Sequence, residues 1–177
     1  WLELSLVPPI DLSGRLGYLI GYPHGCGEQT VSKAFPQLFL PDAVSLGPKE
    51  LADVKANVIS AVSRMADFQM ANGGFAFWPG GYEESQWLSA YVTHFLVMAK
   101  RQGYTVAQDV LQPALDYLKQ RVTAFADGTD HAKAEQSYRL YVLALAGSPD
   151  IAGMNRLLEY GPHRPPVVYQ LASAYAL

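Results

Sequence analysis

The chain has 177 residues, which fits one domain of ordinary size with a buried core. Its 13 Lys and Arg against 16 Asp and Glu give a net charge of −3 with no basic cluster, so the charge pattern of nucleic-acid binding is absent. No apolar run approaches the roughly 20 residues of a membrane span, and we expect no direct membrane contact. The single cysteine cannot form an internal disulfide, which leaves the redox compartment open.

The first predicted element is a short β-strand over residues 2–6. Leucine alternates there with Glu and Ser, a pattern of period two that stops at Pro8-Pro9. A single strand requires a partner strand, so this segment should pair with a strand that is not adjacent to it in the sequence.

Helical periodicity follows and continues along the rest of the chain. Apolar stripes predict an outer amphipathic helix over 51–65, an inner helix with two adjacent stripes over 87–99, and further helices over 111–122 and 134–145. Ser148 and Pro149 predict a short helix with Ser148 as its N-cap and Pro149 at its first position, and Pro165-Pro166 predicts the start of a last helix.

Two local features refine this pattern. We expect Asp109 to be the N-cap of the helix over 111–122, because Pro113 then falls in the first turn, where amides have no helical acceptor. The segment 73–85, GGFAFWPGGYEES, is too aromatic for a linker and predicts a packed loop.

A repeat is visible in the inner helices. Tyr91-Val92 and Tyr141-Val142 are separated by one helical-hairpin length, and a period near 50 residues is typical of stacked helix pairs in a solenoid or a closed ring. The fold class predicted from the pattern is therefore all-α and repetitive.

The only cysteine lies in GYPHGCGEQT, residues 21–30. A helix-like stretch follows Cys26, so Gln29, three residues on, should be its neighbour. Helix N-terminal amides favour a thiolate, and its attack on the Gln29 carboxamide with loss of ammonia would give an internal thioester. Gly25 and Gly27 would let the backbone take positive φ beside that ring. In the alternative interpretation Cys26 is a small buried hydrophobe and the glycines belong to a turn.

The string GCGEQ, which comprises Gly25, Cys26, Gly27, Glu28 and Gln29, resembles the thioester motif of the alpha-2-macroglobulin and complement family. Pro36, ten residues after Cys26, and NGGFAFWPGG followed by SQWLSAYVTHFLVMAKRQGY are also similar to family members. YPHGC and WPGG resemble the bacterial branch, and the resemblance covers roughly residues 12 to 177.

The resemblance implies an α/α toroid of helical hairpins. Residues 1–10 would then be a strand and linker from an adjacent β-domain, and residues 11–177 a thioester domain that holds part of the ring and is truncated on its C-terminal side. No cofactor or metal is implied. The parent protein would be periplasmic or extracellular, in a defence role akin to innate immunity.

The implied activity is protease inhibition rather than enzymatic turnover. A target protease cuts a bait segment, and the exposed thioester of Cys26 and Gln29 then acylates a lysine amine or a hydroxyl on the attacker. The implied partners are target proteases and the other domains of the parent macroglobulin.

Family thioesters are shielded from water by aromatic and apolar side chains, some from another domain. The resemblance makes four residues candidates for the local part of that shield, namely Tyr22, Trp78, Tyr82 and Trp87. The alternative is that they are ordinary core aromatics at helix spacing.

Some complement relatives transfer the acyl group through a distant histidine, and His131 lies near the corresponding place. A solvated loop histidine is the alternative there. His24 could polarise the thioester or serve the turn structurally, whereas His94, among apolar neighbours, is predicted to be a hydrogen-bonded core residue.

Three other functions remain open at this point. QMANGGFAFW resembles the repeat of terpene cyclases and prenyltransferases, which share the toroid, but the chain has no Asp-rich box for their chemistry. A cysteine hydrolase using Cys26 with His24 or His131 would need an orienting Asn or Asp. A non-covalent helical scaffold is the third alternative.

Overall fold

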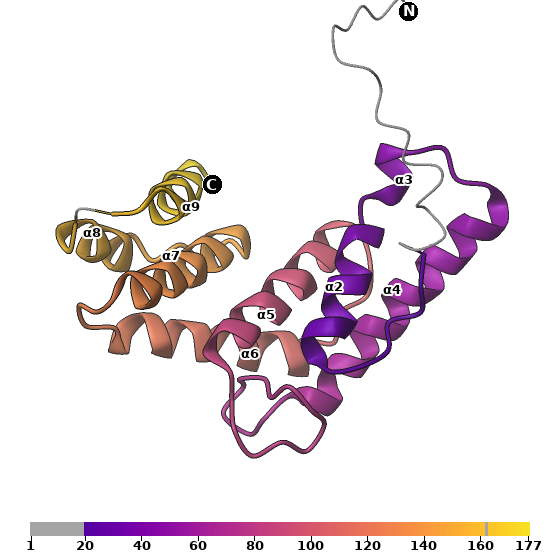
Figure 1. Ribbon diagram of the computed structural model, residues 1–177, viewed down its shortest axis with the longest axis horizontal. Helices are drawn as coiled ribbons and strands as arrows, with labels where there is room; N and C mark the ends of the chain where they lie inside the picture. Colours follow the sequence, from indigo (N-terminus) through magenta and orange to yellow (C-terminus); the bar gives the residue numbers. More distant parts are fainter. Residues whose placement is uncertain (1–19, 162) are drawn as a thin grey trace, which may run out of the picture.

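A computed structural model describes residues 20–161 and 163–177 (Figure 1). Its elements are α2 (Gly27–Gln37), α3 (Leu40–Ala43), α4 (Pro48–Phe68), α5 (Gln86–Arg101), α6 (Gln108–Ala124), α7 (Asp130–Leu145), α8 (Ile151–Glu159) and α9 (Pro165–Ala176). These residues form no strand, which confirms the all-α prediction for the described part. The strand predicted over residues 2–6 lies outside it.

The helices form two groups. Helices α2, α4 and α5 pack side by side, while α8 and α9 pack on α7 (Figure 1). The groups are joined because α7 also packs on α5 and α6. No helix in either group combines the length and apolarity that a bilayer crossing requires, within the ranges described.

Helix α5 lies at the centre of this arrangement and contacts α2, α4, α6 and α7. The stripe with Leu88 and Val92 is fully buried, whereas the neighbouring stripe is fully buried at Phe95 but exposed at Trp87, where the helix begins. Helix α4 buries a single stripe, which includes Val54 and Val58, and exposes its opposite face. The sequence prediction of an inner helix at 87–99 and an outer one at 51–65 is thus confirmed.

Two predicted helix starts are wrong. Helix α6 begins at Gln108 with Ala107 as N-cap, so Asp109 lies inside the first turn, where its charge still suits the helix dipole. The N-cap of α8 is Asp150 rather than Ser148, because the Asp150 carboxylate accepts a 2.7 Å hydrogen bond from the Gly153 amide.

The loop between α4 and α5 is packed at its base and exposed at its tip. Phe75 is fully buried, and its amide donates to the Ser89 hydroxyl oxygen at 2.8 Å. The Ser85 amide donates to the Phe75 carbonyl at 3.0 Å, which closes the loop on itself. The prediction of a packed loop is confirmed at this base, and the loop reaches the start of α2, where the motif lies (Figure 1).

Candidate functional site

The segment before α2, residues 21–25, is fixed by side chains of α4. The Tyr22 hydroxyl lies 2.8 Å from the Ser60 hydroxyl oxygen. The Arg64 guanidinium donates to the Pro23 carbonyl oxygen. The chain therefore enters α2 along a path that the neighbouring helix determines.

Cys26 is the N-cap of α2 and Gln29 occupies the third helical position. The backbone N–H of Cys26 donates to the side-chain oxygen Oε1 of Gln29 at 3.2 Å. This half of a capping box folds the carboxamide back over the first turn, toward the residue that carries the thiol. Cys26 is partly exposed.

The two glycines beside Cys26 have different roles. Gly25 has φ of +110°, and a Cβ placed on it would lie 2.0 Å from Gln29 Oε1, so a side chain there would collide with the carboxamide. Gly27 does not share the positive φ that the sequence predicted for both, because it is already the first residue of the helix. Its amide instead donates to the Phe77 carbonyl at 2.8 Å.

A groove of about 520 Å³ runs along the outer face of α2 beside the carboxamide. The described residues that line it are His24, Gly25, Glu28, Gln29, Ser32, Lys33 and Pro36. We refer to it as the α2 groove. The groove places Gln29 on one surface with four other residues of the GCGEQ motif and its neighbouring sequence, namely His24, Gly25, Glu28 and Pro36.

The polar wall of the α2 groove continues into α5. The Ser32 hydroxyl donates to Glu28 Oε1 at 2.6 Å, and Ser32 Oγ lies 3.2 Å from the Tyr91 hydroxyl oxygen. The Tyr91 ring stacks on Trp87 with centroids 5.2 Å apart. Sequence reasoning missed Ser32 and Tyr91, although Ser32 is four residues after Glu28 and hence its neighbour on the helix.

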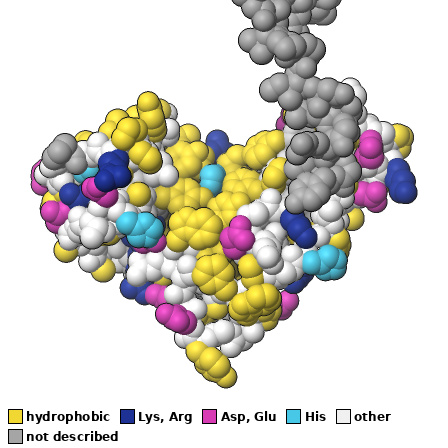
Figure 2. Space-filling model, in the orientation of Figure 1, with side chains coloured by type: hydrophobic (Ala, Val, Ile, Leu, Met, Phe, Trp, Pro, Cys, Tyr) yellow, Lys and Arg dark blue, Asp and Glu magenta, His cyan; other side chains and the backbone are white. Residues whose placement is uncertain are grey.

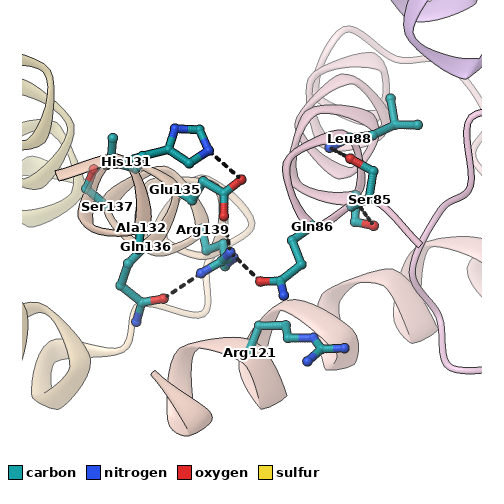
Figure 3. A network of polar contacts seen from close by, with 12 residues as sticks. Ser85, Gln86, Leu88, Arg121, His131, Ala132, Glu135, Gln136, Ser137 and Arg139 are labelled. Carbon is teal, nitrogen blue, oxygen red and sulfur yellow. Dashed lines mark hydrogen bonds and ion pairs between the residues drawn. The ribbon is translucent and has the colours of Figure 1, made fainter. Parts of the chain in front are cut away.

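His131 lies away from the α2 groove. Its side chain is 83% exposed at the start of α7, with Nε2 3.6 Å from Glu135 Oε1 (Figure 3). It lines a separate hollow of about 390 Å³ together with Trp87 and Tyr91. No three His, Cys, Asp or Glu side chains come together as a metal site anywhere in the described ranges.

The four aromatic candidates are spread over the surface around the motif. Tyr22 stands against His24, with ring centroids 4.4 Å apart. Trp78 and Tyr82 are 61% and 101% exposed on the loop between α4 and α5, in a groove of their own. Trp87 is not among the described residues that line the α2 groove, and its ring stacks on Tyr91, whose hydroxyl contacts Ser32 of that groove.

A cluster of aromatic side chains lies where the two helix groups meet, and Figure 2 shows hydrophobic side chains gathered there. His94 Nδ1 lies 2.9 Å from the Tyr138 hydroxyl, and the His94 ring is edge-on to Phe35 and Tyr141. Burial lowers the pKa of His94 to about 4 and raises that of Tyr138. The prediction of a hydrogen-bonded core histidine is confirmed.

Residues 7–137 match the family profile described as the A-macroglobulin TED domain. The chain belongs to the alpha-2-macroglobulin family. This match covers most of the chain and confirms the resemblance drawn from GCGEQ.

Bacterial alpha-2-macroglobulins are among the most similar relatives. The chain is 36% identical over 171 residues to the alpha-2-macroglobulin of Escherichia coli (strain K12), which covers 90% of the chain and 10% of that protein. It is 32% identical over 169 residues to that of Xylella fastidiosa (strain Temecula1), with 89% and 10% covered. The chain thus spans about a tenth of the length of these relatives.

Solved structures of the family share the fold. Native Escherichia coli alpha-2-macroglobulin, from domain MG7 to the C-terminus, matches with a TM-score of 0.78 and 29% identity over 96% of this chain and 29% of that one. Salmonella alpha-2-macroglobulin reacted with methylamine matches with a TM-score of 0.75 and 26% identity, covering 95% and 12%. The predicted α/α toroid of this thioester-domain family is thereby confirmed.

Proposed function

We propose that Cys26 and Gln29 form an internal thioester in this alpha-2-macroglobulin thioester domain. The observation that carries the proposal is the hydrogen bond from the Cys26 amide to Gln29 Oε1, which holds the carboxamide over the residue that bears the thiol. Attack of the Cys26 sulfur on Gln29 Cδ closes the ring, and the thiol proton passes to the amide nitrogen, which leaves as ammonia. Gly25 leaves room for the carbonyl oxygen where any side chain would displace it.

The same hydrogen bond also favours the reaction of the closed thioester with a nucleophile. The Cys26 N–H lies at the positive end of α2 and donates to the acyl oxygen, so it stabilises the oxyanion that forms when a nucleophile attacks Cδ. The nucleophile becomes acylated and Cys26 leaves as a thiolate. Since the Gln29 side chain is consumed, each molecule reacts once and the domain is a trap rather than an enzyme.

The target of this reaction is proposed to be an attacking protease, acylated on a lysine amine or a hydroxyl after bait cleavage elsewhere in the parent protein. Related structures include Escherichia coli alpha-2-macroglobulin activated by trypsin and by porcine elastase. They support a role in which contact with a protease changes the state of the molecule. A periplasmic or extracellular location would bring the domain to such proteases.

We further propose that residues 11–177 belong to the thioester domain and residues 1–10 to a strand and linker of a neighbouring β-domain. Neighbouring domains would complete the shield to which Tyr22, Trp78, Tyr82 and Trp87 contribute locally. His24, which lines the α2 groove, is better placed than His131 for acting on the acyl group.

Intact mass of the full-length gene product tests the thioester. The fresh protein should be one ammonia lighter than its sequence, and methylamine should add at residue 29 while a Cys26 thiol appears. Cys26→Ser and Gln29→Asn variants should have the mass of their sequences and take up no methylamine. A fresh wild-type protein with the mass of its sequence and no uptake would overturn the proposal.

A further inference from the structure

Glu28 is the acidic side chain that lines the α2 groove, and its carboxylate is the final acceptor in a series of hydrogen bonds between hydroxyl groups. Ser32 has one hydroxyl proton, which it donates to Glu28 Oε1 at 2.6 Å. Its contact of 3.2 Å with Tyr91 therefore has the tyrosine as donor. The hydrogen bonds thus run from Tyr91 of α5 through Ser32 to the Glu28 carboxylate. The Tyr91 ring is held in turn by its stack on Trp87.

These hydrogen bonds fix Oε1 of the Glu28 carboxylate and leave Oε2 available to a ligand in the groove. Among the hydrogen bonds and ion pairs of the described residues, Glu28 Oε2 has no partner, whereas Oε1 accepts from Ser32. Glu28 is half-buried and directly precedes Gln29, whose carboxamide lines the same groove. The other titratable side chains lining the groove are His24 and Lys33.

The chemistry of amine attack requires two opposite charges to be stabilised. A neutral amine adds to an acyl carbon before it loses its proton, so positive charge develops on nitrogen as negative charge develops on oxygen. The Cys26 N–H serves the oxygen. A carboxylate beside the acyl group serves the nitrogen and also concentrates ammonium ions in the groove.

We propose that Glu28, oriented by Ser32 and Tyr91, is the counter-charge and proton acceptor for an attacking primary amine and makes the α2 groove selective for lysine-type amines over water and alcohols. This inference rests on the proposed thioester. The amine nitrogen bonds to Cδ of residue 29, the C–S bond breaks with its electron pair on Cys26 Sγ, and one N–H proton passes to the Glu28 carboxylate and then to solvent. An amide and a free Cys26 thiolate result.

The experiment compares two rate constants in the full-length gene product, after mass has shown which molecules carry a closed thioester. One is the rate of methylamine incorporation and the other is the rate of hydrolysis without amine. In Glu28→Gln the ratio of amine to water reaction should fall about tenfold or more. Ser32→Ala and Tyr91→Phe should lower it less, because they loosen the carboxylate but retain it, and Glu28→Asp should recover part of the loss.

Glu159→Gln is the matched control, since it removes an exposed charge at the end of α8 and should leave the ratio unchanged. A purely structural Glu28 would alter both rates together or lower the closed fraction, with the ratio kept. If Glu28→Gln fails to close its thioester, Ser32→Ala and Tyr91→Phe decide, because they leave the motif intact. If variants with a closed thioester keep the wild-type ratio of amine to water reaction, this inference is overturned and the proposed function stands. If the wild-type protein itself carries no thioester, the proposed function is overturned as well.

Discussion

The backbone N–H of Gly27 donates a hydrogen bond to the carbonyl oxygen of Phe77 at 2.8 Å. This bond ties the first turn of α2 to the tip of the loop between α4 and α5. It satisfies one of the amides that a helix N-terminus leaves without a partner, and it does so from a residue fifty positions later in the chain. The exposed aromatic side chains next to Phe77 are therefore carried on a loop that is anchored to the motif.

Replacing Trp78 or Tyr82 by alanine should separate shielding from stability. Both side chains are exposed, so either change should alter the free energy of unfolding of this chain by no more than about 0.5 kcal/mol. If they shield the thioester together with a neighbouring domain, both variants should hydrolyse faster than wild type in the full-length gene product. Urea unfolding and thiol release measure the two effects, and unchanged hydrolysis in both variants would remove them from the shield.

Gly25→Ala should prevent thioester closure. The new Cβ would collide with Gln29 Oε1, and the positive φ should cost about 1–3 kcal/mol of folding stability. Gly80→Ala is the control, because Gly80 also has positive φ, at +69°, but open space around its Cβ position. Both variants should lose stability in urea unfolding, yet only Gly25→Ala should have the full mass of its sequence. A closed thioester in Gly25→Ala would show that the carboxamide lies elsewhere in the mature protein.

Local sequence was sufficient for the parts of the site that lie on one helix. Residues three and four apart are neighbours on α2, so the pairing of Cys26 with Gln29 followed from spacing, and that of Glu28 with Ser32 could have followed in the same way. Helix α5 was predicted as an inner helix because two adjacent apolar stripes leave it only a narrow polar face.

Contacts between segments that are far apart in the sequence could not be predicted from periodicity or local spacing. Tyr91 reaches Ser32 across 59 positions, and no periodicity specifies which polar atom an inner tyrosine will meet. The Phe77 carbonyl is a backbone group, which any residue could supply. Ser148 and Asp150 both fit the rule for a helix N-cap, and only the position of Gly153 decided between them.

Arg139→Met should destabilise the fold strongly. The Arg139 guanidinium is 3% exposed and donates to Glu135 at 2.9 Å and to Gln86 at 2.7 Å, as Figure 3 shows. Its removal leaves a half-buried carboxylate without its cation, at a cost of about 3 kcal/mol in unfolding free energy.

The matched control for Arg139 is Arg164→Met, which breaks the exposed pair of Arg164 with Asp130 and should cost less than about 1 kcal/mol. Urea unfolding of both variants gives the comparison. Equal losses would mean that burial adds nothing to the Arg139 network.

His94 should make the stability of the chain depend on pH in a defined window. Its pKa is about 4 in the folded state and near 6.5 when unfolded, so between these values the unfolded chain binds more protons. The free energy of unfolding should therefore fall as the pH is lowered through this window, by up to about 3 kcal/mol from this residue. Urea unfolding at several pH values between 7 and 4 measures the slope.

His94→Phe should flatten that slope, because phenylalanine fills the site beside Phe35 and Tyr141 without a proton to gain. Tyr138→Phe tests the hydrogen bond separately. It removes the partner of His94 Nδ1 and should lower stability by about 1 kcal/mol at pH 7, while the buried imidazole keeps the pH dependence. If His94→Phe and wild type lose stability in parallel on acidification, the acid sensitivity belongs to other groups and the imidazole is more hydrated than its packing indicates.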